Sequence, residues 1–379
     1  MRSFLVYALA AVMVAGVLVA YSQLRDEGPA RASGRSIGAP VDPPVLLVRS
    51  GDRVPASWAE RAAGVPGVDA VVYVRRGQAL LTRVVDTTGQ VLQTVRPGYA
   101  IPVDALVADP GAYASMLPGR AAAAVAELRP GEAVLSQSAA LRRGVDVGDT
   151  LEFAGGKLYV GAVLEDGMLN GAEMLLSQPE AGVQLRAALL LARIDERGAQ
   201  RRVAHEFARD RVQVLWRGFS YGTRRGPIVQ PGELKARFGE VAVRLPFGRD
   251  WVRLDPDWVR ANIVREELPI LGPVKCNRLI VPRLRRALAS LERRGLSRLV
   301  DKRDFAGCYA PRRIPATGAL SLHAVGLAVD LNARRNPYDK PSRQDPRLVR
   351  TMQRAGFVWG GAWPTVNDAM HFEWQGAGG

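Results

Sequence analysis

Two short segments near the C-terminus combine histidine with carboxylate side chains. The first, SLHAVGLAVDLN, places His323 seven positions before Asp330, with only small and apolar residues between them. Alternation from Gly326 onward predicts a strand whose polar face carries Asp330. A turn before this strand would bring the imidazole of His323 over the same face. The opposite face would carry the apolar side chains Leu327, Val329 and Leu331.

The second segment, NDAMHFEW, repeats the pattern. In a strand, His371 and Glu373 share one face, while Phe372 and Trp374 share the other. Asp368 lies three residues before His371. Two imidazoles and one carboxylate form a three-ligand set that leaves a position for water, which is typical of catalytic zinc rather than structural zinc. The alternative is a pair of core histidines with surface acids.

Together the segments resemble the S-x-H-x-x-G-x-A-x-D and (D/E)-x-x-H motifs of the zinc D-alanyl-D-alanine carboxypeptidases. That family includes vancomycin-resistance peptidases and phage L-alanyl-D-glutamate endopeptidases, and the resemblance covers roughly residues 240–376. It implies that His323, Asp330 and His371 are the zinc ligands. It also implies that Asp368 is the general base, although many members have glutamate there and aspartate is closer to the endopeptidase branch.

The resemblance assigns further roles around the zinc. It implies that the segment GCYAPRRIP supplies an arginine for the oxyanion, and we expect Arg312 in this role with Arg313 as the alternative. Glu373 is expected to orient a ligand and is the alternative base. Ser321 is expected to hold a ligand through a hydrogen bond, or else to act only as a capping or turn residue. WGGAW matches a Trp-Gly-rich turn before the last ligand.

The implied activity is hydrolysis of peptidoglycan stem peptides. Zinc would activate water, and Asp368 would accept its proton. The motifs leave open whether a terminal D-alanine is released or the stem is cut internally. Hydrolysis of another peptide or of a small amide is a third, weaker alternative.

The sequence contains two cysteines, Cys276 and Cys308. A disulfide between them would indicate an oxidising compartment, and it would stabilise the domain by about 3–4 kcal/mol. Two unrelated buried thiols are the alternative. Zinc binding by this pair is disfavoured because neither cysteine lies in a C-x-x-C motif.

The N-terminus carries a run without charged residues from Ser3 to Leu24. About 20 apolar residues in a helix span a hydrocarbon core of about 30 Å. We therefore expect a transmembrane anchor over residues 1–24 rather than a cleaved signal peptide, because no clean A-x-A site follows. Residues 25–44, rich in Gly, Pro, Ser and charge, are expected to be a linker. The expected location is the cell membrane, with a single span and the bulk of the chain extracytoplasmic.

Residues 45–218 predict an α+β accessory domain. VDAVVYVRRGQALLTRVVD predicts two strands joined around Arg76-Gly77, and DTLEFAGGKLYVGAVL predicts a hairpin. With the preceding GEAVLSQSAALRRG, the hairpin resembles the extracytoplasmic core domain of macrolide-exporter-type ABC permeases over about 40 residues. That resemblance implies a role in contacts or shape rather than catalysis. His205 stands alone on a predicted helix and is expected to be structural or at the surface.

Residues 219–249 are expected to link this domain to a peptidase domain over residues 250–379. Two amphipathic helices are predicted there. One lies in CNRLIVPRLRRALASLERRG, and the other, in DPRLVRTMQRAG, has Asp345 at its N-cap and Pro346 at its first position. The expected fold class is α+β, with a small antiparallel sheet that carries the metal site.

The formal net charge of +15 favours anionic partners. Because the N-terminus predicts export, anionic wall polymers and lipid headgroups are preferred over nucleic acid. The protein partner of the accessory domain stays unknown. A second hypothesis is a non-catalytic envelope protein, in which the accessory domain docks a partner and the metal only stabilises the fold.

Overall fold

The computed structural model describes residues 44–50, 54–195, 198–216, 222–223, 226–227, 234–235, 238–248, 250–363 and 366–376. The expected anchor, residues 1–24, lies outside this part of the chain, as does the expected linker except for Pro44. Within the described ranges, no helix combines the length and the apolar character needed to cross a membrane.

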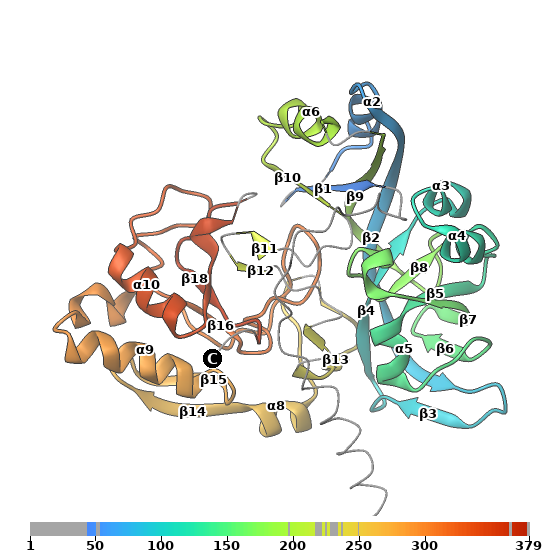
Figure 1. Ribbon diagram of the computed structural model, residues 1–379. Coiled ribbons are helices and arrows are strands. Elements are labelled where there is room, and N and C mark those ends of the chain that lie inside the picture. The colour runs from blue at the N-terminus through green and yellow to red at the C-terminus, as the bar shows by residue number, and fades with distance from the viewer. Residues whose placement is uncertain are drawn as a thin grey trace, which may run out of the picture. The chain divides into compact units, whose positions relative to one another are not determined.

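The N-terminal part of the described chain is built on one large sheet, which has eleven strands within the described ranges (Figure 1). They are β1 (Val45–Ser50), β2 (Val68–Val85), β3 (Val91–Thr94), β4 (Tyr99–Val107), β5 (Glu132–Ser136), β6 (Thr150–Phe153), β7 (Gly156–Leu164), β8 (Met174–Leu176), β9 (Gln184–Ile194), β10 (Val212–Trp216) and β13 (Val243–Arg244). The order is β10-β1-β9-β2-β6-β7-β5-β8-β4-β13, and β3 pairs with β2. Because β2 also pairs with β4, the strands from β2 to β4 in this order close into a ring.

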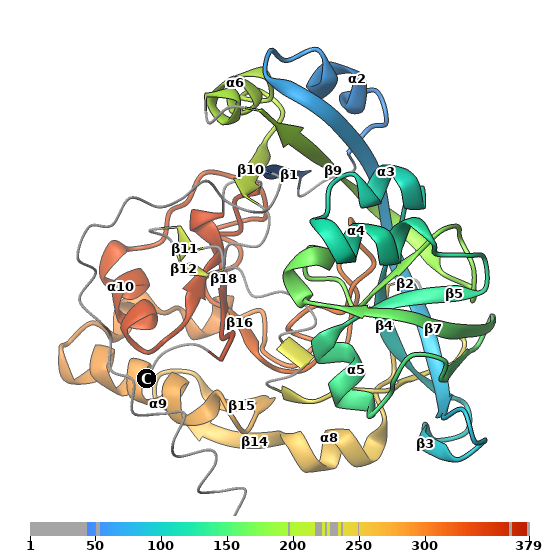
Figure 2. The ribbon, with the colours of Figure 1, turned by 45° about the vertical axis from the view of Figure 1, so that its right-hand side comes forward.

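The long strand β2 belongs both to the ring and to its extension through β9, β1 and β10 (Figure 2). It runs unbroken for 18 residues, so the prediction of two strands joined around Arg76-Gly77 was wrong. The register with β9 instead shifts between Arg76 and Gly77. A Cβ at Gly77 would lie 2.3 Å from the carbonyl oxygen of Gln184, so this glycine marks a close approach of β9 within a strand and not a turn.

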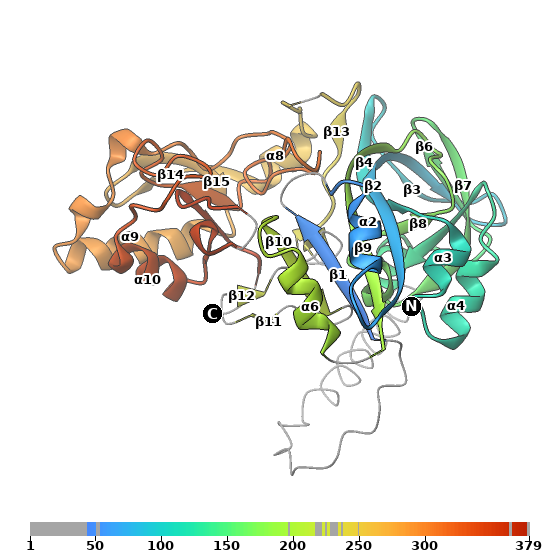
Figure 3. The same ribbon diagram turned by 90° about the horizontal axis from the view of Figure 1, so that it is seen from above.

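Short helices cover the sheet. They are α2 (Trp58–Ala63), α3 (Pro110–Ala114), α4 (Gly119–Ala126), α5 (Gln137–Arg143), the 3-10 turn η1 (Asp166–Leu169) and α6 (Ala199–Glu206). Contacts join α4 and α5 to β7, α2 to β2, and α6 to β10 (Figure 3). The predicted hairpin is confirmed as β6 and β7, with its alternate side chains Leu151, Phe153, Leu158 and Val160 buried. His205 is exposed on α6.

Among its described residues, the range expected as a linker, residues 219–249, contains three short strands: β11 (Gly222–Thr223), β12 (Gly226–Pro227) and β13. β11 pairs with β12. β13 pairs with β4, where Val243 lies opposite Ala100 and Arg244 opposite Tyr99. Part of this range therefore joins the large sheet.

The described C-terminal part of the chain combines three α-helices with small antiparallel sheets. Its elements are α8 (Pro256–Asn262), β14 (Ile263–Leu268), β15 (Gly272–Asn277), α9 (Val281–Arg293), η2 (Ser297–Leu299), η3 (Lys302–Asp304), β16 (Ala328–Asp330), α10 (Pro346–Arg354), β17 (Val358–Trp359), η4 (Gly360–Ala362) and β18 (His371–Glu373). β14 pairs with β15, and the other sheet has the order β16-β18-β17. The described chain is thus a mixed α and β structure.

Both helices expected in this part are present. α10 begins as predicted, with Pro346 in its first turn and the side chain of Asp345 accepting a hydrogen bond from the N–H of Arg347. α9 buries one stripe of leucines, consisting of Leu284, Leu288 and Leu291. These leucines pack in one core with Val329 of β16 and Phe372 of β18. The helices therefore support the small sheet from its apolar face.

The expected disulfide between Cys276 and Cys308 is present and lies in the same core. It joins the end of β15 to the segment that follows η3, across a sequence separation of 32 residues. Both cysteines are buried. The cross-link therefore fixes the loop that contains Cys308 to strand β15.

Replacing both cysteines with alanine (C276A/C308A) should lower the free energy of unfolding by about 3–4 kcal/mol, because the unfolded chain regains the freedom of a closed loop of this size. Urea unfolding monitored by circular dichroism measures the change. Reduced wild type is the control and should unfold at a similar urea concentration. An unchanged midpoint in both samples would contradict the expected contribution.

Candidate metal centre

β16 and β18 bring a carboxylate and an imidazole together. The antiparallel register places Asp330 directly opposite His371 and Val329 opposite Phe372. Side chains opposite each other in such a pair lie on the same face. Val329 and Phe372 are buried in the apolar core, so Asp330 and His371 occupy the other face, as the alternation predicted.

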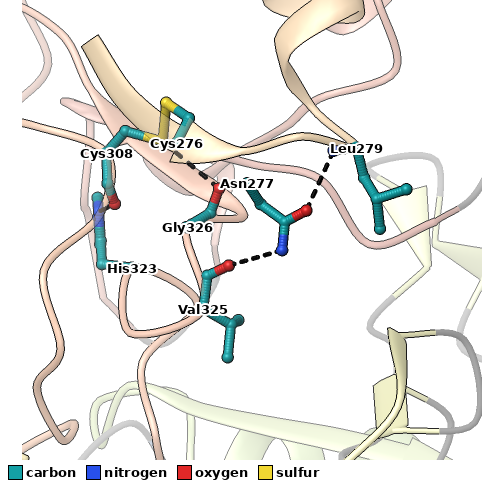
Figure 4. Close-up of a disulfide and its surroundings, with 7 residues drawn as sticks. All are labelled: Cys276, Asn277, Leu279, Cys308, His323, Val325 and Gly326. Atoms are coloured by element: carbon teal, nitrogen blue, oxygen red, sulfur yellow. Dashed lines mark hydrogen bonds between the residues drawn. A yellow bond between two sulfur atoms is a disulfide. The ribbon is translucent and has the colours of Figure 1, made fainter. Parts of the chain in front are cut away.

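His323 reaches this face from the turn that precedes β16. Gly326 has a φ of +67°, and a Cβ at this position would lie 2.7 Å from the backbone nitrogen of Asn277. The N–H of Asn277 donates to the Gly326 carbonyl (3.0 Å), and its side-chain amide donates to the Val325 carbonyl (3.0 Å) (Figure 4). The glycine of the first motif is therefore required both for the turn and for its contact with β15.

Three donor atoms meet at one point. Nε2 of His323 lies 3.1 Å from Nδ1 of His371, and each of these nitrogens lies 3.1 Å from Oδ1 of Asp330. All three residues are buried. Their ligand atoms form a group able to hold a metal ion. The structure thus brings together the three residues expected to be ligands.

Outer hydrogen bonds orient both imidazoles. Nδ1 of His323 lies 3.0 Å from the carbonyl oxygen of Cys308, and Nε2 of His371 lies 2.9 Å from Oε2 of Glu373 (Figure 4 shows the first pair). Each outer nitrogen must carry a proton to donate to its oxygen partner. In the neutral tautomers, both inner nitrogens therefore direct lone pairs toward the carboxylate of Asp330.

This donor set fits zinc. Ligand atoms around a tetrahedral zinc with bonds of about 2.0–2.1 Å lie about 3.3 Å apart, close to the 3.1 Å separations of the three atoms. Three inward lone pairs repel one another unless a cation or a proton lies between them. Imidazole and carboxylate ligands without thiolate are also the set used at catalytic zinc sites.

Without metal, the cluster retains a proton. Burial lowers the pKa of His371, but the hydrogen bonds that its ring donates to Asp330 and Glu373, together with the charges of these carboxylates, outweigh burial and raise the pKa to about 10. Burial also acts on Asp330 by raising its pKa, but the hydrogen bonds of both histidines reverse this effect and hold the pKa well below the usual range. A proton on His371 therefore occupies the space that a metal ion would take.

Asp368 lies at the entrance to β18. Its N–H donates to the Gly360 carbonyl (3.2 Å), and its own carbonyl accepts from the N–H of His371 (3.1 Å). Oδ1 of Asp368 is buried and has no hydrogen-bond partner among the described residues. Burial raises the pKa of this carboxyl; the nearby His371 opposes the rise, and the charge of Asp330 adds to it. A carboxylate with a raised pKa and a free oxygen beside the metal ligands is suited to proton transfer.

The two adjacent arginines face different surroundings. The guanidinium of Arg313 is buried and donates to the Gly318 carbonyl (2.6 Å). The charge of Arg312 instead acts on the carboxyl of Asp368 and lowers its pKa. Side chains of successive residues in extended backbone point to opposite sides, so only one of the two can face the metal ligands. The arrangement favours Arg312.

Ser321 and Glu373 hold the ligands by different means. Oγ of Ser321 accepts the backbone N–H of His323 (3.2 Å), so this serine is a turn residue that fixes the backbone of a ligand. Glu373 accepts from the imidazole of His371 itself. Its carboxylate is therefore occupied in orienting the ring, which leaves Asp368 as the carboxylate with a free oxygen.

Two contributors to the site escaped the sequence reasoning. Asn277 anchors the turn of His323, but no local pattern pairs it with a segment 48 residues away. The ring of Trp363 lies 5.2 Å from the ring of His371, centroid to centroid. The resemblance marks the WGGAW segment as a turn, but it does not indicate that the second tryptophan of the segment contacts His371. Trp363 forms an apolar wall beside the metal ligands.

Comparison with known proteins gives a family match near the C-terminus of the chain. The sequence model of a D-alanyl-D-alanine carboxypeptidase family matches residues 315–374, a range that includes the three ligand candidates and Asp368. No curated protein matches the chain. The C-terminal match supports a peptidase of the D-alanyl-D-alanine carboxypeptidase type, and hence a hydrolase.

Solved structures similar to the chain include the periplasmic region of MacB from Actinobacillus actinomycetemcomitans, with 10% identity, a TM-score of 0.29, and coverage of 45% of this chain and 88% of that one. Another is the extracellular domain of the noncanonic ABC-type transporter YknZ from Gram-positive bacteria, with 11% identity, a TM-score of 0.27, and coverage of 45% and 99%.

Zinc binding to the metal-free protein at pH 7 should release about one proton, because the metal displaces the proton of His371. Since the pKa of His371 is raised to about 10, the imidazole is protonated below that pH, and the apparent affinity should rise as the pH increases toward it. Below that pKa the rise should be about tenfold per pH unit. Calorimetry in buffers of different ionisation enthalpy measures the released proton.

The variant H205Q is the matched control, since His205 is exposed on α6. It should release the same proton as wild type. Zinc binding without proton release in wild type would show that His371 is already neutral and that the described balance of charges is wrong.

Proposed function

We propose that the chain is a zinc-dependent peptidase that acts on peptidoglycan stem peptides. The observation that carries this proposal is the convergence of His323, Asp330 and His371 at mutual distances of 3.1 Å, beside the free carboxylate oxygen of Asp368. Those three residues would hold the metal. Bound zinc would lower the pKa of a water molecule and would polarise the scissile carbonyl.

Asp368 acts as the general base in this proposal. Its free oxygen accepts a proton from the attacking water and then passes it to the leaving amine. A pKa raised by burial suits both transfers, because the carboxyl accepts a proton readily and also gives it up. Attack on the carbonyl places negative charge on its oxygen, and the guanidinium of Arg312 stabilises that charge.

The remaining residues of the site keep the ligands oriented. Glu373 and the Cys308 carbonyl hold the two imidazoles in the tautomers that direct lone pairs inward. Trp363 covers one side of His371 and keeps bulk water away from it. These residues preserve the geometry of the site without taking part in proton transfer.

The buried disulfide supports a location outside the cytoplasm, where such bonds persist. Together with the apolar N-terminus, it favours a membrane-anchored protein whose peptidase part faces the cell wall. The net charge of +15 suits an anionic envelope. Release of a terminal D-alanine and cleavage inside the stem both fit the site.

The deciding experiment is mass spectrometry of peptidoglycan fragments before and after incubation with the zinc-loaded, full-length protein in detergent. A mass loss of one alanine identifies a carboxypeptidase, and longer fragments identify an endopeptidase. If intact peptidoglycan and synthetic stem peptides stay unchanged, the proposal fails and a non-catalytic envelope protein becomes the better interpretation.

The variant D368N should lower kcat by about 10²–10⁴-fold, because the amide cannot accept a proton. Zinc content and the thermal midpoint should stay at wild-type values, since Oδ1 of Asp368 accepts no hydrogen bond from any other described residue. Metal analysis and steady-state kinetics on a synthetic stem peptide measure both. E373A is the comparison: it should weaken zinc binding by about 10–100-fold, because it removes the oxygen that accepts the N–H of His371. Wild-type turnover by D368N would move the role of base to another residue.

A further inference from the structure

Residues 250–255, at the border of the range expected as a linker, lie beside β13. The N–H of Arg244 donates to the Arg253 carbonyl (2.7 Å), and the N–H of Asp255 donates to the Ala242 carbonyl (2.9 Å). β13 itself pairs with β4. Residues 250–255 therefore extend the large sheet by one more extended segment.

The other edge of residues 250–255 forms backbone hydrogen bonds with residues 311–313. The N–H of Val252 donates to the Pro311 carbonyl (3.0 Å), and the N–H of Arg313 donates to the Asp250 carbonyl (2.8 Å). Amide groups of successive residues in extended backbone point to opposite edges. Residues 250 and 252 thus use one edge, while residues 253 and 255 use the other.

Residues 310–312 form backbone hydrogen bonds with the turn that carries His323. The N–H of Ser321 donates to the Arg312 carbonyl (3.1 Å), and the N–H of Ala310 donates to the His323 carbonyl (2.9 Å). A continuous series of backbone hydrogen bonds therefore runs from β4, through β13, residues 250–255 and residues 310–313, to His323.

The side chain of Arg313 fastens this series at its centre. Besides the bond to Gly318, its guanidinium donates to the Gly248 carbonyl (3.2 Å) and to Oε1 of Gln184 in β9 (3.3 Å). It lies 4.0 Å over the ring of Phe247. Only 2% of Arg313 is exposed. One side chain thus connects the large sheet, the segment before residue 250 and the loop that precedes His323.

A buried guanidinium is costly unless hydrogen bonds compensate for its lost hydration. Burial lowers the pKa of Arg313 to about 10, and the charge of Arg186 adds to this effect. Because the compensating oxygens come from three separate segments, the guanidinium holds these segments in one arrangement. Its backbone is fixed with them, and so is the backbone of the preceding residue.

We propose that Arg313 is a positioning residue. It binds the large sheet to residues 310–323 and thereby holds Arg312 toward the proposed metal ligands. The accessory part of the chain is then a component of the active site rather than a separate module. This inference rests on the function proposed above, in which Arg312 stabilises the oxyanion. Arg313 does not contact the substrate; it acts through its neighbour.

A double-mutant cycle in the full-length, zinc-loaded protein tests this relation. R313M alone should lower kcat on a stem peptide about tenfold and change KM less than about threefold, because Arg312 loses its orientation. In the background of R312M, the same substitution should change kcat by less than about twofold. An equal loss of kcat in both backgrounds would overturn the proposal, since it would show that Arg313 acts independently of Arg312.

Milder variants serve if R313M folds poorly. R313K keeps the charge but loses the planar group that bonds several oxygens at once, and Q184A removes only the partner in β9. Both should lower kcat in the same direction as R313M, by smaller factors. R285M is the control, because Arg285 is exposed on α9 and pairs with Glu266. It should match wild type in kcat and KM.

A readout without substrate separates this inference from the proposed function. Hydrogen exchange of peptides that span residues 310–323 should become about tenfold faster in R313M and stay unchanged in R285M. This result would support the positioning role even if wild type hydrolyses no stem peptide. Unchanged exchange in R313M would reject that role even if wild type is an active peptidase.

Discussion

The structure depends on three lone pairs that converge within a buried space. His323, His371 and Asp330 direct acceptor atoms at one another from 3.1 Å, an arrangement that is stable only with a cation or a proton between them. The Cys308 carbonyl and Glu373 enforce this arrangement from outside, because each binds the proton-bearing nitrogen of one ring. The repulsion is thus built into the fold and makes the site selective for a positively charged ion.

Such a cluster needs rigid supports, and the apolar core supplies the first of them. The small sheet packs Val329 and Phe372 against α9 and α10, which sets the positions of Asp330 and His371. The disulfide and Asn277 fix the loops that carry the Cys308 carbonyl and the turn of His323. Apolar packing therefore positions two of the three candidate ligands, and a covalent and hydrogen-bonded frame positions the third.

The large sheet is joined to the C-terminal part of the chain by hydrogen bonds, and this connection bears on what the sheet can do. A sheet joined to a peptidase by a loose linker would affect only its location. Backbone hydrogen bonds instead run from β4 to the turn of His323, and Arg313 fastens them by contacts with Gln184 and Gly248. Strain or movement in the sheet would therefore reach the orientation of Arg312 directly. This arrangement gives a peptidase a physical route by which a second module can influence catalysis.

Local patterns in the sequence were sufficient to single out the three candidate ligands that the fold brings together, and the elements that carry them. Alternation around Asp330 and His371 predicted which side chains enter the core, and the caps of α10 could be read from Asp345 and Pro346, because these signals depend on neighbours in the chain. Local patterns failed at Gly77, because a glycine that allows the close approach of β9 gives the same sequence signal as a glycine in a turn.

Only the tertiary structure distinguished the surroundings of Arg312 from those of Arg313, identified Asn277 and Trp363 beside the candidate ligands, and joined β13 to the large sheet. Each of these depends on contact with a distant segment. Arg312 and Arg313 are identical in type and adjacent in sequence, so only their hydrogen bonds to residues 250 and 321 distinguish their positions and direct their side chains to different surroundings. Composition and spacing carry no information about that register, because it is set by packing between segments that meet only in the folded chain.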